Sequence, residues 1–391
     1  MVVEKGTPSY TPPASLVPFE SDLDLLPLHY TPKGSVVALR RELSPTEINY
    51  FEWLYGGLLP VEIISQTSFL ADNYIISPWG FAPNMSHQLK QLSSGKIFDS
   101  TWNGEWRDFL SRKTAVEFLK RRAHLLEHLD FNPPFLPTLV GSMEELNQLT
   151  SQGDFVVKSL WSSSGRGVFI SKDCKLTRNE LNMIVSYFRQ GHQVVVEPYF
   201  NKVEDFSIQF MVNSTQNVTY KAVTLFETDS RGRYVGSLVG ADIEAFYNKY
   251  IDAFCGLSLF DFAKCVGEGV KQLLSDHPSN PFAIVDNNAT KRPIGVDMMV
   301  YRNSEGKLKI HPCIEINWRY TMGYVAHCLS ERLSNGLHGR LVVGQIPNWV
   351  ERCKTATNLC DYDSEPYRKA GFYPLSRWVG DVQFGAYVEL C

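Results

Sequence analysis

The sequence predicts an α+β protein, with a sheet-and-helix body and a smaller N-terminal α/β domain. Strand-like segments dominate residues 155–320, each rich in β-branched residues and bounded by turn signals. Two helical stretches, roughly 178–190 and 257–274, interrupt these strands without the regular alternation of a βαβ repeat. At 391 residues the chain is also too long for one ordinary core, so two or three packed subdomains are expected.

Composition and charge exclude several classes of protein. Hydrophobic residues make up 44% of the chain and charged residues 20%, which is typical of a soluble globular protein. A net charge of −4 with a pI of about 6.2 provides no basic field for a nucleic acid. Apolar runs such as residues 58–64 are interrupted by Pro60 and Glu62, so no segment approaches a membrane span. We therefore expect neither a nucleic-acid nor a membrane partner.

The N-terminus and the cysteines indicate a cytoplasmic protein. Residues 1–16 lack the basic segment and apolar core of a secretory signal. The eight cysteines contain no CxxC pair, which argues against a zinc knuckle or a dithiol redox motif. Free thiols in a cytoplasmic protein are the prediction.

The sequence divides into four predicted regions. Residues 1–35 carry six prolines, which restrict helix and remove backbone donors, so an extended lead-in is expected. Residues 36–110 alternate short apolar stretches with turn residues and predict the small α/β domain. The body is expected over residues 111–330, followed by a C-terminal extension over residues 331–391.

The elements of the body follow from periodicity and turn signals. A helix is predicted over residues 114–129, where apolar residues share one face and Thr114 with Glu117 fits a capping box. Three prolines end it, and residues 142–150 predict a second, short helix. The strands are then expected at residues 155–158, 194–197, 206–212, 218–226, 294–301 and 307–317.

A lysine at the end of a strand marks a candidate phosphate site. Lys158 closes the strand FVVK and precedes the loop SLWSSSGRGVFI, whose Ser163, Ser164, Gly165 and Gly167 can offer backbone N–H groups to phosphate oxygens. Neither GxxxxGK[ST] nor GxGxxG is present. A plain β-hairpin turn is the alternative, but the fixed positive charge beside the loop favours a triphosphate.

Acidic side chains on two consecutive strands mark a candidate metal site. Strand alternation sets Asp297 opposite the apolar face of IGVDMMVY, and it sets Glu315 and Asn317 on one face of the next strand. The turn RNSEG can join the two strands as a hairpin, so the three side chains can meet. Two carboxylates and an amide suit Mg²⁺ delivered with a nucleotide, whereas a solvated hairpin face is the alternative. Arg319, two residues beyond Asn317, would face the same cavity and hold a carboxylate or phosphate.

In this order the motifs resemble the ATP-grasp superfamily, which includes D-alanine ligases, biotin carboxylases and glutathione synthetases. The resemblance covers roughly residues 109–323, and it is carried by the lysine of LSRK, FVVK with SSSGRGV, VVVEPYF followed by DFSIQ, and the acid strand with IEINWR. It implies an ATP-grasp fold, in which two α+β subdomains grip ATP, preceded by an N-terminal α/β pre-ATP-grasp domain.

The resemblance also implies roles for individual residues. Those for the nucleotide are phosphate contacts from Lys113 and Lys158, an adenine contact from Glu197, a hinge backbone at Tyr199 and Phe200, and ribose binding by Asp205. Those for the metal and the substrate are Mg²⁺ ligation by Asp297, Glu315 and Asn317 and engagement of an anionic substrate by Arg319. Lys158 and Arg319 are the predicted catalytic residues.

The predicted activity is an ATP-dependent ligase that activates a carboxylate as an acyl phosphate and joins it to an amine or thiol, releasing ADP and phosphate. ATP and Mg²⁺ are the expected cofactors, and the partners are a small-molecule carboxylate and an amine, with a homodimer left open. Two alternatives stay open: a kinase-like phosphotransferase with a hydroxyl or phosphate acceptor, and a non-catalytic ATP-binding module.

Overall fold

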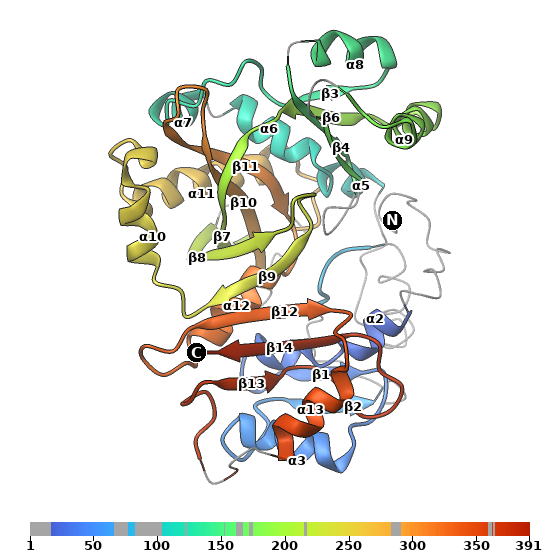
Figure 1. Cartoon of the computed structure of the whole chain (residues 1–391), viewed down its shortest axis with the longest axis vertical. Helices are drawn as coiled ribbons and strands as arrows, with labels where there is room; N and C mark the ends of the chain where they lie inside the picture. The colour runs from blue at the N-terminus through green and yellow to red at the C-terminus, as the bar shows by residue number, and fades with distance from the viewer. Residues whose placement is uncertain are drawn as a thin grey trace.

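The computed structural model describes residues 17–65, 77–82, 104–121, 123–151, 153–161, 167–171, 175–214, 217–282, 291–358, 362 and 364–391. Helices and strands are mixed without a regular βαβ order, so the predicted α+β class is confirmed. Figure 1 shows a small sheet at one end, a larger sheet through the middle, and the two terminal regions together at the other end.

The small sheet has four antiparallel strands in the order β3-β6-β4-β5. Two helices accompany it, and each begins at a side-chain cap: Ser142 accepts from Glu145 N, and Thr177 forms a capping box with Glu180. Apolar side chains of both helices and all four strands form its core. The elements are β3 (Thr138–Val140), α8 (Met143–Thr150), β4 (Phe155–Ser159), β5 (Val168–Ser171), α9 (Arg178–Arg189) and β6 (Val194–Pro198).

The large sheet has eight antiparallel strands in the order β11-β10-β7-β8-β9-β12-β14-β13. Its main core joins the first four of these strands to α6 and α11. The elements of this part are α5 (Glu105–Phe109), α6 (Lys113–Arg121), α7 (Ala123–His128), β7 (Asn201–Ser214), β8 (Asn217–Thr228), β9 (Tyr234–Val239), α10 (Ile243–Lys249), η3 (Ile251–Phe254), α11 (Leu259–Asp276), β10 (Arg292–Arg302), β11 (Leu308–Asn317) and α12 (Met322–Ser330).

These bounds confirm the predicted strands of the body and the helices near 142–150, 178–190 and 257–274. The capping box predicted for residues 114–129 is wrong. Thr114 lies inside α6 and donates to Ser111 O, while Glu117 bonds His277 at 2.8 Å. Ser111, which precedes the helix, accepts from Lys113 N instead.

The two terminal regions of the described chain share a second core. Apolar residues between positions 23 and 61 pack with others between positions 320 and 390, and β1 pairs with β2 in parallel beside them (Figure 1). The elements here are α2 (Val17–Asp22), η2 (Leu26–His29), β1 (Val36–Leu39), α3 (Pro45–Leu54), β2 (Glu62–Ser65), β12 (Gly339–Gly344), α13 (Trp349–Asn358), β13 (Gly371–Pro374) and β14 (Gly385–Leu390).

Part of the expected extended lead-in is helical. Residues 17–22 and 26–29 form α2 and the 3-10 turn η2, and Leu25 and Leu28 are fully buried. Pro18 and Pro27 are each the second residue of their element. A proline in the first turn of a helix loses no intrahelical hydrogen bond, so these prolines do not prevent helix here.

Candidate functional site

The β10–β11 ribbon brings the three predicted metal ligands together. Asp297 lies directly opposite Glu315, and Gly295 lies opposite Asn317. From this diagonal position Asn317 Nδ2 donates to Asp297 Oδ2 at 2.8 Å. The ribbon therefore presents two carboxylates and one amide on one side.

Arg319 extends this cluster. Its Nη2 donates to Asn317 Oδ1 at 2.9 Å and its Nη1 donates to the carbonyl of Tyr320 at 3.0 Å. Its side chain also packs on Gly80, where a Cβ would lie only 3.1 Å from Arg319 Cβ. These contacts hold the guanidinium beside Asn317.

Strand alternation does not run unbroken along β11. Asp297 pairs with Glu315 while Met299 pairs with His311, so β11 contains two more residues than β10 over this interval. Pro312 lies in the irregular segment, where its missing N–H removes no regular ladder bond. Ile314, in the same irregular segment, lines a cavity together with Lys158 and Glu197.

The pKa of Asp297 is perturbed. Burial, and next the negative charge of Glu315, raise the pKa of Asp297 to about 7. Hydrogen bonds from Ser207 and Asn317 and the charge of Arg319 act in the opposite direction. A cation at this cluster would favour the ionised carboxylate, which fits the hard-oxygen ligand set.

A buried polar chain supports Asp297 from behind. Ser207 lies opposite Asp297 on β7, and Gln209 Nε2 donates to Ser207 Oγ at 2.8 Å. Thr321 Oγ1 donates to Gln209 Oε1 at 2.7 Å, and Thr321 is also the N-cap of α12. The sequence prediction missed Ser207 and Gln209, although their alternation with Phe206 in DFSIQ indicates that they face away from the core.

Arg112 is a second residue that the sequence prediction missed. Its Nη2 lies 2.9 Å from Glu315 Oε2, and its Nη1 donates to the carbonyl of Ser159 at 2.7 Å. It therefore joins β4 of the small sheet to β11 of the large sheet. Its neighbour Lys113, the predicted phosphate contact, pairs with Asp108 at 2.8 Å. The two adjacent cations in LSRK are the sequence signal for a basic residue at the site. The sequence does not indicate which of the two side chains points into the protein.

Lys158 and Glu197 form a buried ion pair across β4 and β6. Lys158 pairs with Val195 in the register and Glu197 pairs with Val156, so their side chains are diagonal neighbours on one face. The two side chains are 8% and 6% exposed. A cavity of about 10 Å³ lies beside them, and Arg112 and Cys313 are also among its walls. A space this small holds about one water molecule, so a nucleotide needs these side chains to move.

Of the other residues predicted to bind the nucleotide, Tyr199 and Phe200 lie between β6 and β7, and Asp205 lies on β7. Tyr199 N donates to the carbonyl of Asp154 at 2.9 Å, and the ring of Phe200 packs against Tyr301 at 4.6 Å. Asp205 is buried and accepts from Lys202 at 2.5 Å and from Thr228 at 2.7 Å.

The predicted glycine-rich loop is described only at its end. Ser163, Ser164 and Gly165 lie outside the described residues. Gly167 has a φ of 74°, which favours glycine, and its carbonyl accepts from Ser159 N at 2.8 Å. The loop thus returns to the sheet next to the strand that carries Lys158.

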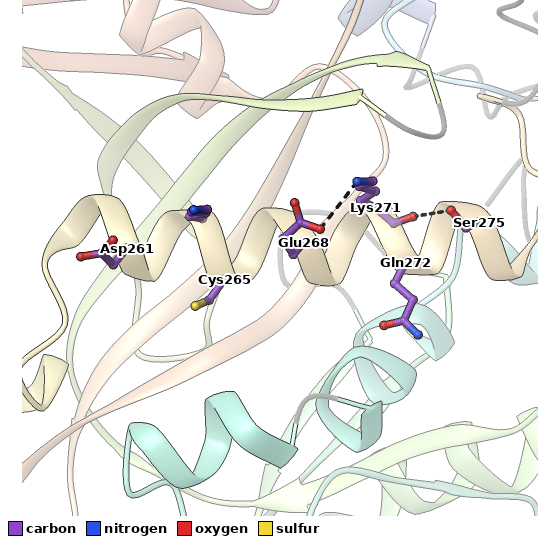
Figure 2. A pocket seen from close by; sticks show the side chains of 7 residues that line it. Asp261, Cys265, Glu268, Lys271, Gln272 and Ser275 are labelled. Carbon is purple, nitrogen blue, oxygen red and sulfur yellow. Dashed lines mark hydrogen bonds and ion pairs between the residues drawn. The ribbon is translucent and has the colours of Figure 1, made fainter.

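A larger surface hollow lies elsewhere. Figure 2 shows it along α11, where Asp261, Glu268 and Lys271 project from one helix. Its volume is about 610 Å³, but every lining residue comes from this single helix, and none is a predicted site residue. Such a surface offers no convergent groups, so we do not assign it a function.

Among the described residues, no group of three His, Cys, Asp or Glu side chains could hold a metal ion by itself. Two carboxylates with one amide fit an ion that takes its other ligands from phosphates and water. Among these same residues, no helix is long and apolar enough to cross a membrane.

Comparisons with known proteins gave structural similarities only. No protein-family model matches the chain, and no curated protein matches its sequence. N5-carboxyaminoimidazole synthetase from Staphylococcus aureus, complexed with ADP, is 13% identical with a TM-score of 0.42, over 84% of this chain and 76% of that chain. Biotin carboxylase from Campylobacter jejuni, in a β-γ-ATP complex, is 12% identical with a TM-score of 0.44, over 84% of this chain and 70% of that chain. D-cycloserine synthetase DcsG is 13% identical with a TM-score of 0.39, over 73% of this chain and 93% of that chain. At TM-scores below 0.5, none of these similarities assigns a function to this chain.

Proposed function

We propose that this chain is an ATP-dependent ligase of the ATP-grasp type, which activates a carboxylate as an acyl phosphate and joins it to an amine or a thiol. The observation that supports this most is the cluster of Asp297, Glu315 and Asn317, extended by Arg319 and tied to the small sheet through Arg112. The proposal assigns the nucleotide and the metal to residues 111–330, and the acceptor side to residues 36–110 and 331–391.

The nucleotide would lie between the two sheets. Lys158 would leave its ion pair with Glu197 to contact phosphate oxygens, which frees the Glu197 carboxylate to accept from the amino group of the base. Lys113 and the loop that contains Ser163, Ser164, Gly165 and Gly167 would add phosphate contacts, with Tyr199 and Phe200 at the hinge and Asp205 at the ribose.

The metal ligands would be Asp297, Glu315 and Asn317. Magnesium bound there would neutralise the charge that develops on the phosphates. The Arg112 guanidinium beside Glu315 would supply further positive charge at the same place.

The chain's own residues would position the carboxylate and the amine for two successive transfer steps. A carboxylate oxygen of the substrate attacks the γ-phosphorus and ADP leaves, so an acyl phosphate forms. The amine then adds to the acyl carbon, and phosphate leaves with loss of a proton from nitrogen. Arg319, fixed by Asn317 and the Tyr320 carbonyl, would hold the carboxylate and then stabilise the oxyanion.

A hydroxylamine trap tests the proposal. The protein is incubated with Mg-ATP and panels of carboxylates and amines, and ADP release and product mass are followed. We expect one carboxylate to yield a hydroxamate when hydroxylamine replaces the amine, because an acyl phosphate reacts with it. Glu315→Gln should abolish this product, whereas Glu305→Gln, an exposed acid in the turn between β10 and β11, should not.

Two results would contradict the proposal. A phosphorylated product that is inert to hydroxylamine would indicate a phosphotransferase. Binding of Mg-ATP without turnover of any combination would indicate a non-catalytic ATP-binding module.

A further inference from the structure

His311 is a buried side chain whose two ring nitrogens have no hydrogen-bond partner in the part of the chain that the structure describes. It lies on β11 with no exposed surface, and neither Nδ1 nor Nε2 has a hydrogen-bond partner among the described residues. A neutral imidazole has one donor and one acceptor, and burying both without partners costs free energy. Such a group calls for an explanation beyond packing.

Another fully buried histidine, His29, provides a contrast. In the two terminal regions, His29 Nε2 lies 2.8 Å from the carbonyl of Leu375, and His29 Nδ1 lies 2.7 Å from the hydroxyl of Tyr55. Both ring nitrogens of this structural histidine are therefore used. His311 differs in this respect and not in burial.

The surroundings of His311 are those of the nucleotide residues. Its ring packs against Phe131 at 4.9 Å and against Phe200, in the proposed hinge, at 5.1 Å. Burial lowers the pKa of His311 to about 4. The negative charge of Glu197 acts to raise this pKa, and the positive charge of Lys158 acts to lower it. The ring is therefore neutral at pH 7, so it keeps both a donor and an acceptor.

We propose that His311 is a specificity-determining residue that donates a hydrogen bond to a ring nitrogen of the purine base. This rests on the proposed function, because it places the base beside Glu197. With Glu197 accepting from the exocyclic amino group, His311 as donor completes a pattern that matches adenine. Guanine presents a carbonyl and a protonated nitrogen on the same edge, so its pattern is reversed.

The test compares base recognition in His311→Phe and in the unaltered chain of 391 residues. Affinities for Mg-ADP, Mg-GDP and magnesium tripolyphosphate are measured by calorimetry. We expect His311→Phe to weaken Mg-ADP binding about tenfold, the effect of losing one hydrogen bond, and to reduce the preference for ADP over GDP. Tripolyphosphate affinity should stay unchanged because that ligand has no base.

Two further variants separate recognition from structure. His311→Asn keeps a donor and an acceptor, so it should retain more of the ADP preference than His311→Phe. His29→Phe removes two satisfied hydrogen bonds, so it should lower the thermal midpoint without changing the ADP to GDP ratio. His311→Phe should not lower the midpoint of the nucleotide-free protein, because it removes no hydrogen bond.

A negative result can contradict the role of His311 alone, or it can contradict the proposed function as well. If His311→Phe and His311→Asn both keep the ADP to GDP ratio within twofold of the unaltered chain, this inference is wrong and the proposed function stands. If the unaltered chain binds tripolyphosphate but shows no base preference, the inference is also wrong. If it binds no magnesium nucleotide at all, the proposed function fails and this inference fails with it.

Discussion

Asp297 is subject to opposing influences. Burial and the charge of Glu315 raise its pKa to about 7, while Ser207, Asn317 and Arg319 favour the ionised form. A divalent cation binds the carboxylate and not the carboxylic acid. Magnesium affinity should therefore rise with pH through this range.

Replacing Asp297 by asparagine tests whether the charge of this side chain contributes to magnesium binding. We expect Mg-ADP affinity at pH 8 to fall by at least about tenfold, because a ligand charge is lost. The pKa of Asp297 is raised above its value in the unfolded chain, so its contribution to stability is full below pH 3.8 and is lost as pH rises through about 7. Without metal, the unaltered chain should therefore lose thermal stability relative to Asp297→Asn between pH 5 and pH 8.

Calorimetry and thermal unfolding over this pH range measure both effects. Glu305→Gln is the control, because Glu305 lies in the exposed turn of the same ribbon. Parallel stability profiles for the unaltered chain and Asp297→Asn would contradict the assigned pKa shift.

Sequence reasoning found this acid cluster because its residues lie on consecutive strands. Asp297, Glu315 and Asn317 need only strand alternation and one hairpin to meet. Ser207 and Arg112 were missed because their contacts join segments far apart in the chain. Arg112 lies 203 positions from Glu315, and no local pattern encodes that approach.

At the scale of elements, α12 is pressed closely against the sheet behind the site. A Cβ at Gly323 would lie 2.5 Å from Gln209 Nε2 and 2.6 Å from Thr224 Oγ1. Both groups belong to the buried polar chain that reaches Ser207. Glycine at position 323 thus leaves room for the hydrogen-bonded polar side chains that support Asp297.

Gly323→Ala should therefore disturb both stability and metal binding. Alanine improves helix propensity by about 1 kcal/mol, but overpacking costs about 1–3 kcal/mol, so we expect a net loss of stability. We also expect Mg-ADP affinity to fall about tenfold through Gln209 and Ser207, as for other residues that support metal ligands. Denaturant midpoints and calorimetry provide the measurements.

A matched glycine gives the comparison for this variant. Gly141→Ala places its methyl group no closer than 3.8 Å to Gln193 Cγ, so stability and metal binding should be unchanged. Equal behaviour of the two variants would show that α12 has room to adjust.

The sequence located most elements of the body but not the irregularity within β11. Period-two patterns predict a strand well, yet a bulge changes which residue faces which side. Pro312 was a visible signal for it. The helix predicted over residues 114–129 corresponds to α6 and α7, and the hydrogen bond from Lys113 N to Ser111 Oγ at the start of α6 lies outside the apolar pattern.

At the scale of the whole molecule, one buried ion pair ties the two ends of the described chain together. Arg377 Nε donates to Asp24 Oδ1 at 2.7 Å and Nη2 donates to Oδ2 at 3.1 Å. The two side chains are 1% and 6% exposed. Arg377 Nη1 also donates to the carbonyl of Glu42 at 3.0 Å, so the guanidinium anchors more than one segment.

Asp24→Asn should destabilise the protein by about 3 kcal/mol, because it leaves a buried guanidinium without its counter-charge. Asp24→Leu combined with Arg377→Met should be less destabilised than the sum of the single variants. Urea unfolding measures these differences. Glu20→Gln breaks the exposed pair with Arg40 and should change stability by less than about 0.5 kcal/mol. If the loss of stability in the double variant equals the sum of the losses in the single variants, Asp24 and Arg377 are not coupled.

The shared terminal core also sets an order of events during synthesis. Asp24 meets Arg377 only after 353 further residues have been added, which takes on the order of 20 to 70 s at about 5–20 residues per second. Strands β3 to β11 and α12 leave the ribosome within that interval, so the nucleotide and metal half can fold first. Leu25, Leu28 and Phe51 must wait for the last strands before they are covered. A nascent chain therefore carries exposed apolar residues between positions 25 and 51 throughout this interval, and it is then that a chaperone would matter most to this protein.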